Sequence, residues 1–340
     1  MNGALRLPAR RGNLSKWQVA LRRRPTPGRQ IALPLLLCGA TGMAIVGPAQ
    51  AQSSYSKGQN VAPAFEGWEQ NPDGSFNFLF GYMNRNWLEE LDVPVGADNM
   101  FAPGPADQGQ PTHFLPRRNR FVFKVRVPAD FGDQELVWTL TSQGKTEYAY
   151  ASLRPDYIVD NMVIASETGA LGPGASTAES RANIPPVVTV IGDSVRRVAV
   201  GEPLSLVAHV DDDNLPRTRR RRSAPETSDA PPTLSRRQLT PPTRITVNKV
   251  VGLNLSWFVF RGPGAVSFDP LQVKVWEDAR TGANSPWAPL WQAPEVPEDG
   301  MWTVNVTFEQ PGTYVLQGRA DDGGLYHDTR VTVIVSPRVS

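Results

Sequence analysis

The chain has 340 residues, 40% of them hydrophobic and 20% charged, so it can form the cores of about two domains of ordinary size. Glycine and proline are frequent, at 29 and 32 residues, and Cys38 is the only cysteine. Because Cys38 lies in an N-terminal apolar run, the rest of the chain cannot contain a disulfide, a thiol nucleophile or cysteine-ligated zinc.

Residues 1–51 have the three regions of a secretory signal peptide. Eight basic residues and no acidic ones come first, the 16-residue apolar run 31–46 follows, and Ala49 and Ala51 precede a cleavage site at Gln52. The apolar run is short for a membrane span. We therefore expect export, by the general secretory or the twin-arginine route, to the periplasm, the cell surface or the exterior. We expect no integral membrane span in the mature chain.

Removal of this presequence changes the sign of the net charge. The whole chain has 35 Lys and Arg against 33 Asp and Glu, whereas the chain after Ala51 has 27 against 33. The basic isoelectric point therefore gives no reason to expect a nucleic-acid partner.

A polar leader, residues 52–60, precedes a strand-rich region that we assign to a first β-sandwich domain, residues 61–165. The turn sequence NPDGS at 71–75 predicts a tight hairpin. Apolar residues then alternate with other residues, as is typical of half-buried antiparallel strands. The alternating residues are Phe76, Phe78, Phe80 and Tyr82, then Phe121, Phe123, Val125 and Val127, then Leu136, Trp138 and Leu140, and then Tyr148 and Tyr150.

Residues 166–186 are small, polar and rich in glycine and proline, which predicts an interdomain linker. A second β-sandwich domain, residues 187–337, contains two irregular inserts. The first, 215–244, has 8 Arg, 6 Pro and 2 acidic residues and is predicted to be disordered. The second, 277–300, follows a strand that we predict at 271–276. Without both inserts the domain has the size of one seven-stranded sandwich, about 100 residues.

The second domain resembles bacterial immunoglobulin-like modules of the polycystic-kidney-disease (PKD) type. The residues that carry this resemblance are Pro311, Gly312, Thr313 and Tyr314, the ADDGG turn at 320–324, the VTVIV strand at 331–335 and the GEPLSLVAHVDDDN segment at 201–214. Trp257 stands where the family places a core tryptophan, although VFRGPG follows it instead of the family's DFGDG. The resemblance implies an immunoglobulin-like fold and an extracytoplasmic setting.

The first domain resembles an uncharacterised module of exported bacterial proteins, through the phrases FGYMNRN, VPVGADN and DQGQPTHFLP. Together, the alternation and the two resemblances predict an all-β protein with two antiparallel immunoglobulin-like β-sandwich domains after a signal peptide.

The sequence predicts no catalytic residues. A serine triad needs a histidine base, and the chain has only His113, His209 and His327, with no G-x-S-x-G elbow. Zinc is not expected either, because neither an H-E-x-x-H motif nor cysteine ligands occur.

Calcium is the one cofactor that the sequence leaves open. Asp211 and Asp213 leave one predicted strand, and Asp321 and Asp322 leave another. If these turns share an end of the sandwich, their carboxylates would supply the oxygen ligands that calcium prefers. The alternative is that aspartate stands at these strand exits because it stabilises turns.

Two further groups of residues lie in the inserts. The first group is the basic run Arg219, Arg220, Arg221 and Arg222. It would attract an anionic partner, or form a solvated loop, or lie against the acidic remainder of the protein itself. Trp287 and Trp291 flank a proline-rich loop, where they would stack on sugar rings if exposed, or cover a core edge if buried.

These observations predict an exported, non-catalytic binding or structural protein of the bacterial cell envelope or exterior. Its partner would be an envelope component, either a glycan or a protein. A glycan-binding accessory module that uses the loop tryptophans is the first alternative, and an uncharacterised hydrolase is the second.

Overall fold

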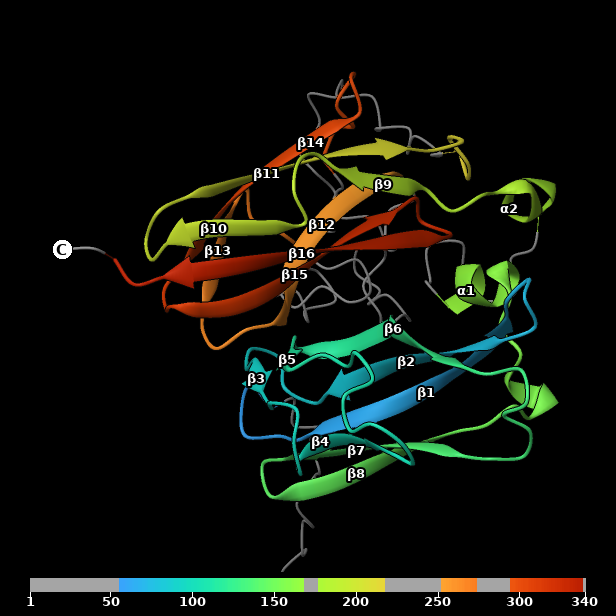
Figure 1. Ribbon diagram of the computed structural model, residues 1–340. Helices are drawn as coiled ribbons and strands as arrows, with labels where there is room; N and C mark the ends of the chain where they lie inside the picture. The colour runs from blue at the N-terminus through green and yellow to red at the C-terminus, as the bar shows by residue number, and fades with distance from the viewer. Residues whose placement is uncertain (1–54, 168–176, 218–251, 274–293, 339–340) are drawn as a thin grey trace, which may run out of the picture. The chain divides into compact units, whose positions relative to one another are not determined.

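The computed structural model describes residues 55–167, 177–217, 252–273 and 294–338. They belong to one compact unit that extends from Gln52 to Ser340. Strands dominate the described residues, and two short α-helices and one 3-10 helix accompany them (Figure 1). The protein is therefore an all-β protein, as predicted.

Two three-stranded antiparallel sheets form the first sandwich (Figure 1). One sheet has the order β1 (Val61–Gln70), β2 (Phe76–Asn84), β6 (Arg117–Val127), and the other has the order β4 (Asn99–Ala102), β7 (Leu136–Ser142), β8 (Lys145–Ala151). A small ribbon pairs β3 (Leu91–Asp92) with β5 (His113–Phe114). The N–H of Gly74 donates to the carbonyl of Asn71 at 3.0 Å, which closes the predicted hairpin between β1 and β2.

Aromatic side chains from both sheets form the core of this sandwich. The ring of Phe80 has its centroid 5.2 Å from that of Phe101, 5.4 Å from that of Phe123 and 6.0 Å from that of Trp138. The buried indole N–H of Trp138 donates to the side-chain oxygen of Asn99 at 2.9 Å. The alternation in the sequence thus places these rings on the inner faces, and the polar groups among them are hydrogen-bonded.

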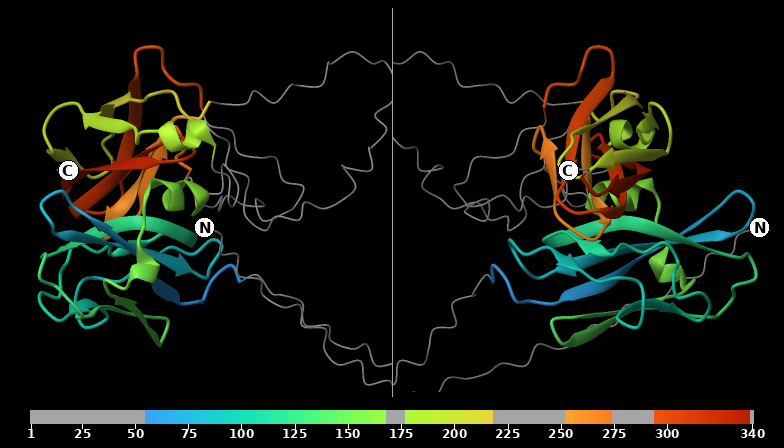
Figure 2. Two further views of the ribbon diagram at one scale, coloured as in Figure 1. Left: turned by 90° about the vertical axis from the view of Figure 1, so that its right-hand side faces the viewer. Right: turned by 60° about the vertical axis from the view of Figure 1, so that its left-hand side comes forward.

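The second sandwich has the strand order of an immunoglobulin domain. One sheet has the order β9 (Val187–Val190), β11 (Leu204–Asp211), β14 (Met301–Phe308), β13 (Val266–Asp269), and the other has the order β10 (Val195–Ala199), β16 (Tyr326–Ser336), β15 (Gly312–Asp321), β12 (Asn254–Arg261). Figure 2 shows these sheets from two further sides. In the immunoglobulin nomenclature they are the A-B-E-D and A′-G-F-C sheets. The pairs in these sheets are antiparallel except for β10 with β16, which is parallel.

Two aromatic residues in this sandwich have the roles expected in an immunoglobulin fold. Trp257 is buried on β12 and lies opposite Gly318 on β15, where a Cβ atom would stand 2.9 Å from the indole ring. The hydroxyl of Tyr314 donates to the carbonyl of Gln310 at 2.9 Å, which is the hydrogen bond of a tyrosine corner. The core position predicted for Trp257 is therefore confirmed.

The segment after the first sandwich contains short helices: η1 (Pro155–Tyr157), α1 (Asn161–Glu167) and α2 (Ala178–Ala182). Ile164 and Ala165 of α1 are buried. Residues 166–186, predicted as a linker, thus include the end of α1 and all of α2. The domain boundaries stay a prediction. The strand predicted at 271–276 is wrong in its described part, since residues 271–273 form none.

Candidate functional site

A bulge in β6 exposes backbone carbonyls to the second sandwich. Along β2 and β6 the pairing jumps from Phe80 with Phe123 to Tyr82 with Asn119. Residues 120–122 therefore leave the ladder, and their carbonyls need partners elsewhere.

Arg319 and Gln317, on the outer face of β15, supply those partners. The guanidinium of Arg319 donates to the carbonyl of Arg120 at 3.1 Å and to that of Phe121 at 2.6 Å. The side-chain amide of Gln317 donates to the carbonyl of Val122 at 3.1 Å. Two side chains of one sandwich thus complete the hydrogen bonds of a strand in the other.

Arg319 is one of the largest fully buried side chains, with 1% of its surface exposed. Its guanidinium donates to both oxygens of Asp328, its cross-strand neighbour on β16, at 2.6 Å each, and lies 4.1 Å from the ring centroid of Tyr326. Burial alone would lower the pKa of Arg319, but the carboxylate of Asp328 raises it above the ordinary value. The cation is therefore retained inside the protein because a bidentate partner neutralises it.

A second set of contacts lies at the other end of this interface. Arg261 on β12 donates to both oxygens of Asp107 at 3.0 and 2.7 Å and to the carbonyl of Gln110 at 2.8 Å. The N–H of Thr112 donates to the carbonyl of Phe260 at 3.1 Å, and the ring of Phe260 belongs to the core of the first sandwich. The two sandwiches are thus joined by apolar packing, by a backbone hydrogen bond, by side-chain hydrogen bonds to backbone carbonyls and by one bidentate arginine–aspartate pair, Arg261 with Asp107.

His113 is buried beside this interface, on β5. Its Nδ1 lies 2.7 Å from a carboxylate oxygen of Asp92 and its Nε2 lies 3.0 Å from one of Glu90. Burial lowers the pKa of His113, but the hydrogen bonds to Asp92 and Glu90 outweigh it and raise that pKa to about 9. The imidazole is therefore a charged cross-link at neutral pH, and neither nitrogen is available to act as a base.

The other two histidines also have structural partners. Nδ1 of His327 accepts the N–H of Val188 at 3.1 Å, and Nδ1 of His209 lies 3.3 Å from a carboxylate oxygen of Asp211. In the part of the chain that the structure describes, no histidine is hydrogen-bonded to a serine, threonine or cysteine side chain. Within the described ranges, none of these histidines is therefore paired with a nucleophile in the way that acyl transfer requires.

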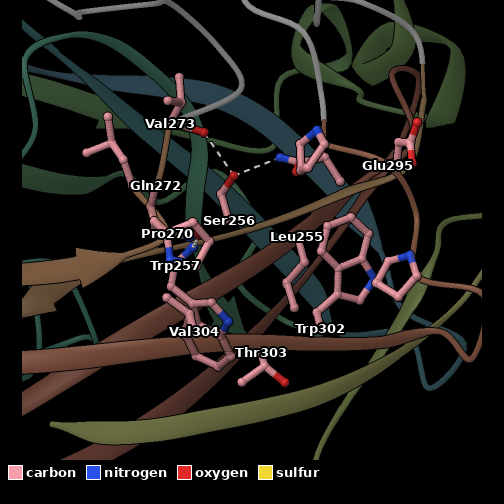
Figure 3. Close-up of a pocket in the computed structure, with 14 residues that line it drawn as sticks. Leu255, Ser256, Trp257, Pro270, Gln272, Val273, Glu295, Trp302, Thr303 and Val304 are labelled. Atoms are coloured by element: carbon pink, nitrogen blue, oxygen red, sulfur yellow. Dashed lines mark hydrogen bonds between the residues drawn. The ribbon is translucent and has the colours of Figure 1, made fainter.

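Two cavities border β12, which is an edge strand of its sheet. The first, of about 350 Å³, is lined by Ser256, Trp257 and Trp302 (Figure 3). Ser256 donates through its hydroxyl to the carbonyl of Val273 at 2.8 Å, and the side-chain oxygen of Gln272 accepts the N–H of Trp257 at 2.9 Å (Figure 3). The chain after β13 is thereby fastened to the edge of β12.

The second cavity, of about 510 Å³, lies between the sandwiches. Trp87 and Leu115 line it from the first sandwich, and Val259 and Phe268 line it from the second. Both volumes fall in the range of about 300–1,000 Å³ that is usual for ligand pockets. Residues 274–293, which follow the lining of both cavities in the sequence, lie outside the described residues.

The two aspartate turns do share one end of the second sandwich. Consecutive residues of the segment after α2 connect them: the amide of Asn183 donates to Asp322 at 3.0 Å, and the N–H of Ile184 donates to Asp213 at 3.0 Å. The other oxygen of Asp322 accepts the N–H groups of Gly324 and Leu325, and burial raises the pKa of Asp322 to about 7.

The remaining two aspartates of the calcium hypothesis lie in the same turns. One oxygen of Asp321 accepts the N–H of Gly323 at 2.8 Å, and Asp211 is exposed beside His209. Among the described residues, no group of three or more histidine, cysteine, aspartate or glutamate side chains is arranged to hold a metal ion. Calcium binding at Asp211, Asp213, Asp321 and Asp322 stays a prediction.

The remaining candidate residues belong to the two predicted inserts. Trp287 and Trp291, predicted to bind sugar, and Arg219, Arg220, Arg221 and Arg222, predicted to attract anions, all lie outside the described residues. None of the helices in the described ranges is long and apolar enough to cross a membrane.

No protein-family model and no curated protein matches the chain. Solved structures similar to it include the S-layer protein rSbsC(31-844) and the adhesin InvE of Yersinia pseudotuberculosis, each at 10% identity with a TM-score of 0.22, and Sidekick-1 immunoglobulin domains 1-5, at 10% identity with a TM-score of 0.20. They align with 82%, 82% and 81% of this chain, which spans 28%, 59% and 38% of theirs, less than two thirds in each case. With TM-scores this low, the strand order and the tyrosine corner identify the fold, and these similarities do not.

Proposed function

We propose that the protein is an exported, non-catalytic binding or structural protein of the bacterial cell envelope or exterior, in which the two sandwiches act as one rigid body. The observation that carries the proposal is the buried arginine, Arg319. Its guanidinium donates to two backbone carbonyls of the β6 bulge, and its charge is neutralised by Asp328. Such a joint suits a protein that holds or presents a surface, because it opposes hinge motion between the modules.

The ionisable groups of the described residues support a non-catalytic role. The charged groups near the interface are paired with one another: Arg319 with Asp328, Arg261 with Asp107, and His113 with two carboxylates. A catalytic acid or base must present a free proton or lone pair to a substrate. These side chains instead spend their hydrogen bonds within the protein.

The export part of the proposal rests on residues 1–51, with their basic, apolar and small-residue regions. The absence of cysteine after Cys38 means that folding outside the cytoplasm does not depend on disulfides.

Cell fractionation tests the proposal. The full chain with a C-terminal tag should be recovered outside the cytoplasm with Gln52 at its N-terminus. An Ala51→Leu variant should keep the presequence, because a large residue at this position blocks cleavage. Recovery of the unprocessed wild-type chain in the cytoplasm would contradict the proposal.

A further inference from the structure

The outer face of the sheet β4-β7-β8 carries an exposed pair of tyrosines. Tyr148 and Tyr150 on β8 are 52% and 56% exposed, and their ring centroids lie 6.1 Å apart with planes tilted by 33°. Ala149 and Ala151 face the core instead, at 4% and 0% exposure. This strand therefore places its smallest side chains inside and its aromatic ones in solvent, the reverse of what packing alone would favour.

The neighbouring strands extend this surface. Through the strand register, Val137 lies opposite Tyr150, Thr139 opposite Tyr148 and Thr141 opposite Thr146. We define the tyrosine face as the outward residues of the three strands: Met100, Ala102, Val137, Thr139, Thr141, Thr146, Tyr148 and Tyr150. All eight are uncharged, and the hydroxyls of Thr141 and Thr146 lie 2.9 Å apart.

The dimensions of the tyrosine face favour a narrow ligand. Strands β7 and β8, of seven residues each, make it roughly 23 Å long, and β4, of four residues, widens part of it to roughly 10 Å. The resulting area of a few hundred Å² is well below the roughly 800 Å² that each partner buries in a stable protein complex. A single polymer chain lying along β8 fits these dimensions better than a folded partner does.

The chemistry of the tyrosine face selects among polymers. An anionic or cationic polymer would find no opposite charge on it, whereas a neutral polymer does not need one. Exposed phenol rings offer flat apolar surfaces for the C–H faces of sugar rings, and they are rigid enough to lose little entropy on contact. The threonine and tyrosine hydroxyls both donate and accept hydrogen bonds, as sugar hydroxyls require.

We infer that the tyrosine face binds a neutral polysaccharide, with the sugar rings stacked on Tyr148 and Tyr150. This inference rests on the proposed binding role and names the class of ligand for it. It uses other residues than the loop tryptophans Trp287 and Trp291.

Affinity electrophoresis tests this inference. The chain from Gln52 onward is run in native gels cast with hydroxyethylcellulose, xyloglucan, galactomannan or dextran, and with alginate as an anionic polymer. At least one neutral polymer should retard the protein. Tyr148→Ala and Tyr150→Ala should each weaken the apparent affinity roughly tenfold, and the double variant should abolish retardation. Tyr148→Phe should keep most of it, because the ring remains.

A matched control is Tyr55→Ala, since Tyr55 is also 52% exposed but lies outside the tyrosine face. This variant should migrate as the wild type does. No retardation by any neutral polymer, retardation by alginate alone, or unchanged retardation of the double variant would overturn the inference. Loss of binding in Trp287→Ala with Trp291→Ala, but not in the tyrosine variants, would assign binding to the loop instead.

Two further measurements separate the possible failures. If the double variant changes the oligomeric state in size-exclusion chromatography, the tyrosine face is a protein interface and the inference is wrong. Fractionation of the wild-type chain is independent of the tyrosines, so a failure of the polysaccharide experiment leaves the proposed export and location standing.

Discussion

Replacing Arg319 by methionine should destabilise the protein more than the same replacement of an exposed arginine does. The change keeps an unbranched apolar stem but removes the donors to Asp328 and to the carbonyls of Arg120 and Phe121. Asp328 would then be a carboxylate at 22% side-chain exposure that has lost its counter-ion.

The magnitude follows from these contacts. Removing one partner of a buried ion pair costs about 3–5 kcal/mol, and leaving a buried carbonyl unsatisfied costs about 1–3 kcal/mol. Because these groups form one network, the terms do not add, and we expect a total loss of about 4 kcal/mol in the free energy of unfolding. At roughly 2–4 °C per kcal/mol for a chain of this size, Tm should fall by about 10 °C.

Guanidinium unfolding of the chain from Gln52 onward, followed by tryptophan fluorescence and calorimetry, measures this loss. The wild type should unfold in one transition. Arg319→Met should unfold in two, because each sandwich has its own core, and the predicted loss should appear in the first of them. Arg126→Met is the matched control: its ion pair with Asp73 has side chains that are 62% and 58% exposed, so the loss should stay below about 1 kcal/mol.

The double variant Arg319→Met with Asp328→Leu separates charge burial from packing. It should recover part of the stability, because no uncompensated charge remains inside. If Arg319→Met instead costs no more than Arg126→Met and still unfolds in one transition, Arg319 does not hold the sandwiches together. The rigid-body part of the proposed function then fails.

Three further predictions concern single side chains. The folded-state pKa of His113, about 9, is above its ordinary value of 6.5, so its contribution to stability is complete below pH 6.5 and is lost as the pH rises through 9. Relative to His113→Gln, the wild type should therefore lose about 2 kcal/mol of unfolding free energy in urea titrations from about pH 7 to about pH 10, after allowance for the half-exposed carboxylates. Gly318→Ala should cost about 1–3 kcal/mol, because its Cβ would meet the ring of Trp257, whereas Gly96→Ala, which has open space, should change Tm little in the same thermal scans. Burial raises the pKa of Asp322 from 3.8 to about 7, so its stabilising contribution is present below pH 3.8 and is lost as the pH rises through 7. From about pH 5 to about pH 8, the free energy of unfolding of Asp322→Asn, measured in denaturant titrations, should therefore rise by about 1–2 kcal/mol relative to that of the wild type. If the difference between the two free energies does not change with pH, the role of burial is contradicted.

The strands that alternate clearly in the sequence are found where they were expected. The core rings of Phe80, Phe123 and Trp138 are predicted because they follow a period of two between turn signals. The core position of Trp257 is predicted only by the resemblance to PKD-type modules. The sequence predicts only that the two aspartate turns could lie at the same end of a sandwich. It does not predict the hydrogen bond from Asn183 that links them, because no sequence motif marks Asn183. The parallel pairing of β10 with β16 depends on two segments more than 130 residues apart, and no local pattern reports it.

For the residues that matter most for the proposed function, the alternation in the sequence predicts the wrong exposure to solvent. Alternation with a period of two indicates that the two faces of a strand differ, but it does not indicate which face is exposed to solvent. On β15, Gln317 and Arg319 stand at positions that read as solvent-facing, yet both are buried because a second sandwich covers that face. On β8, Tyr148 and Tyr150 read as core residues, yet both are exposed. Desolvating an arginine and leaving two phenol rings in water each cost free energy that simpler residues would avoid. Departures of this kind from local preference are expected where a protein makes an interface or a binding surface. The same physical reasoning therefore singles out both the joint at Arg319 and the tyrosine face.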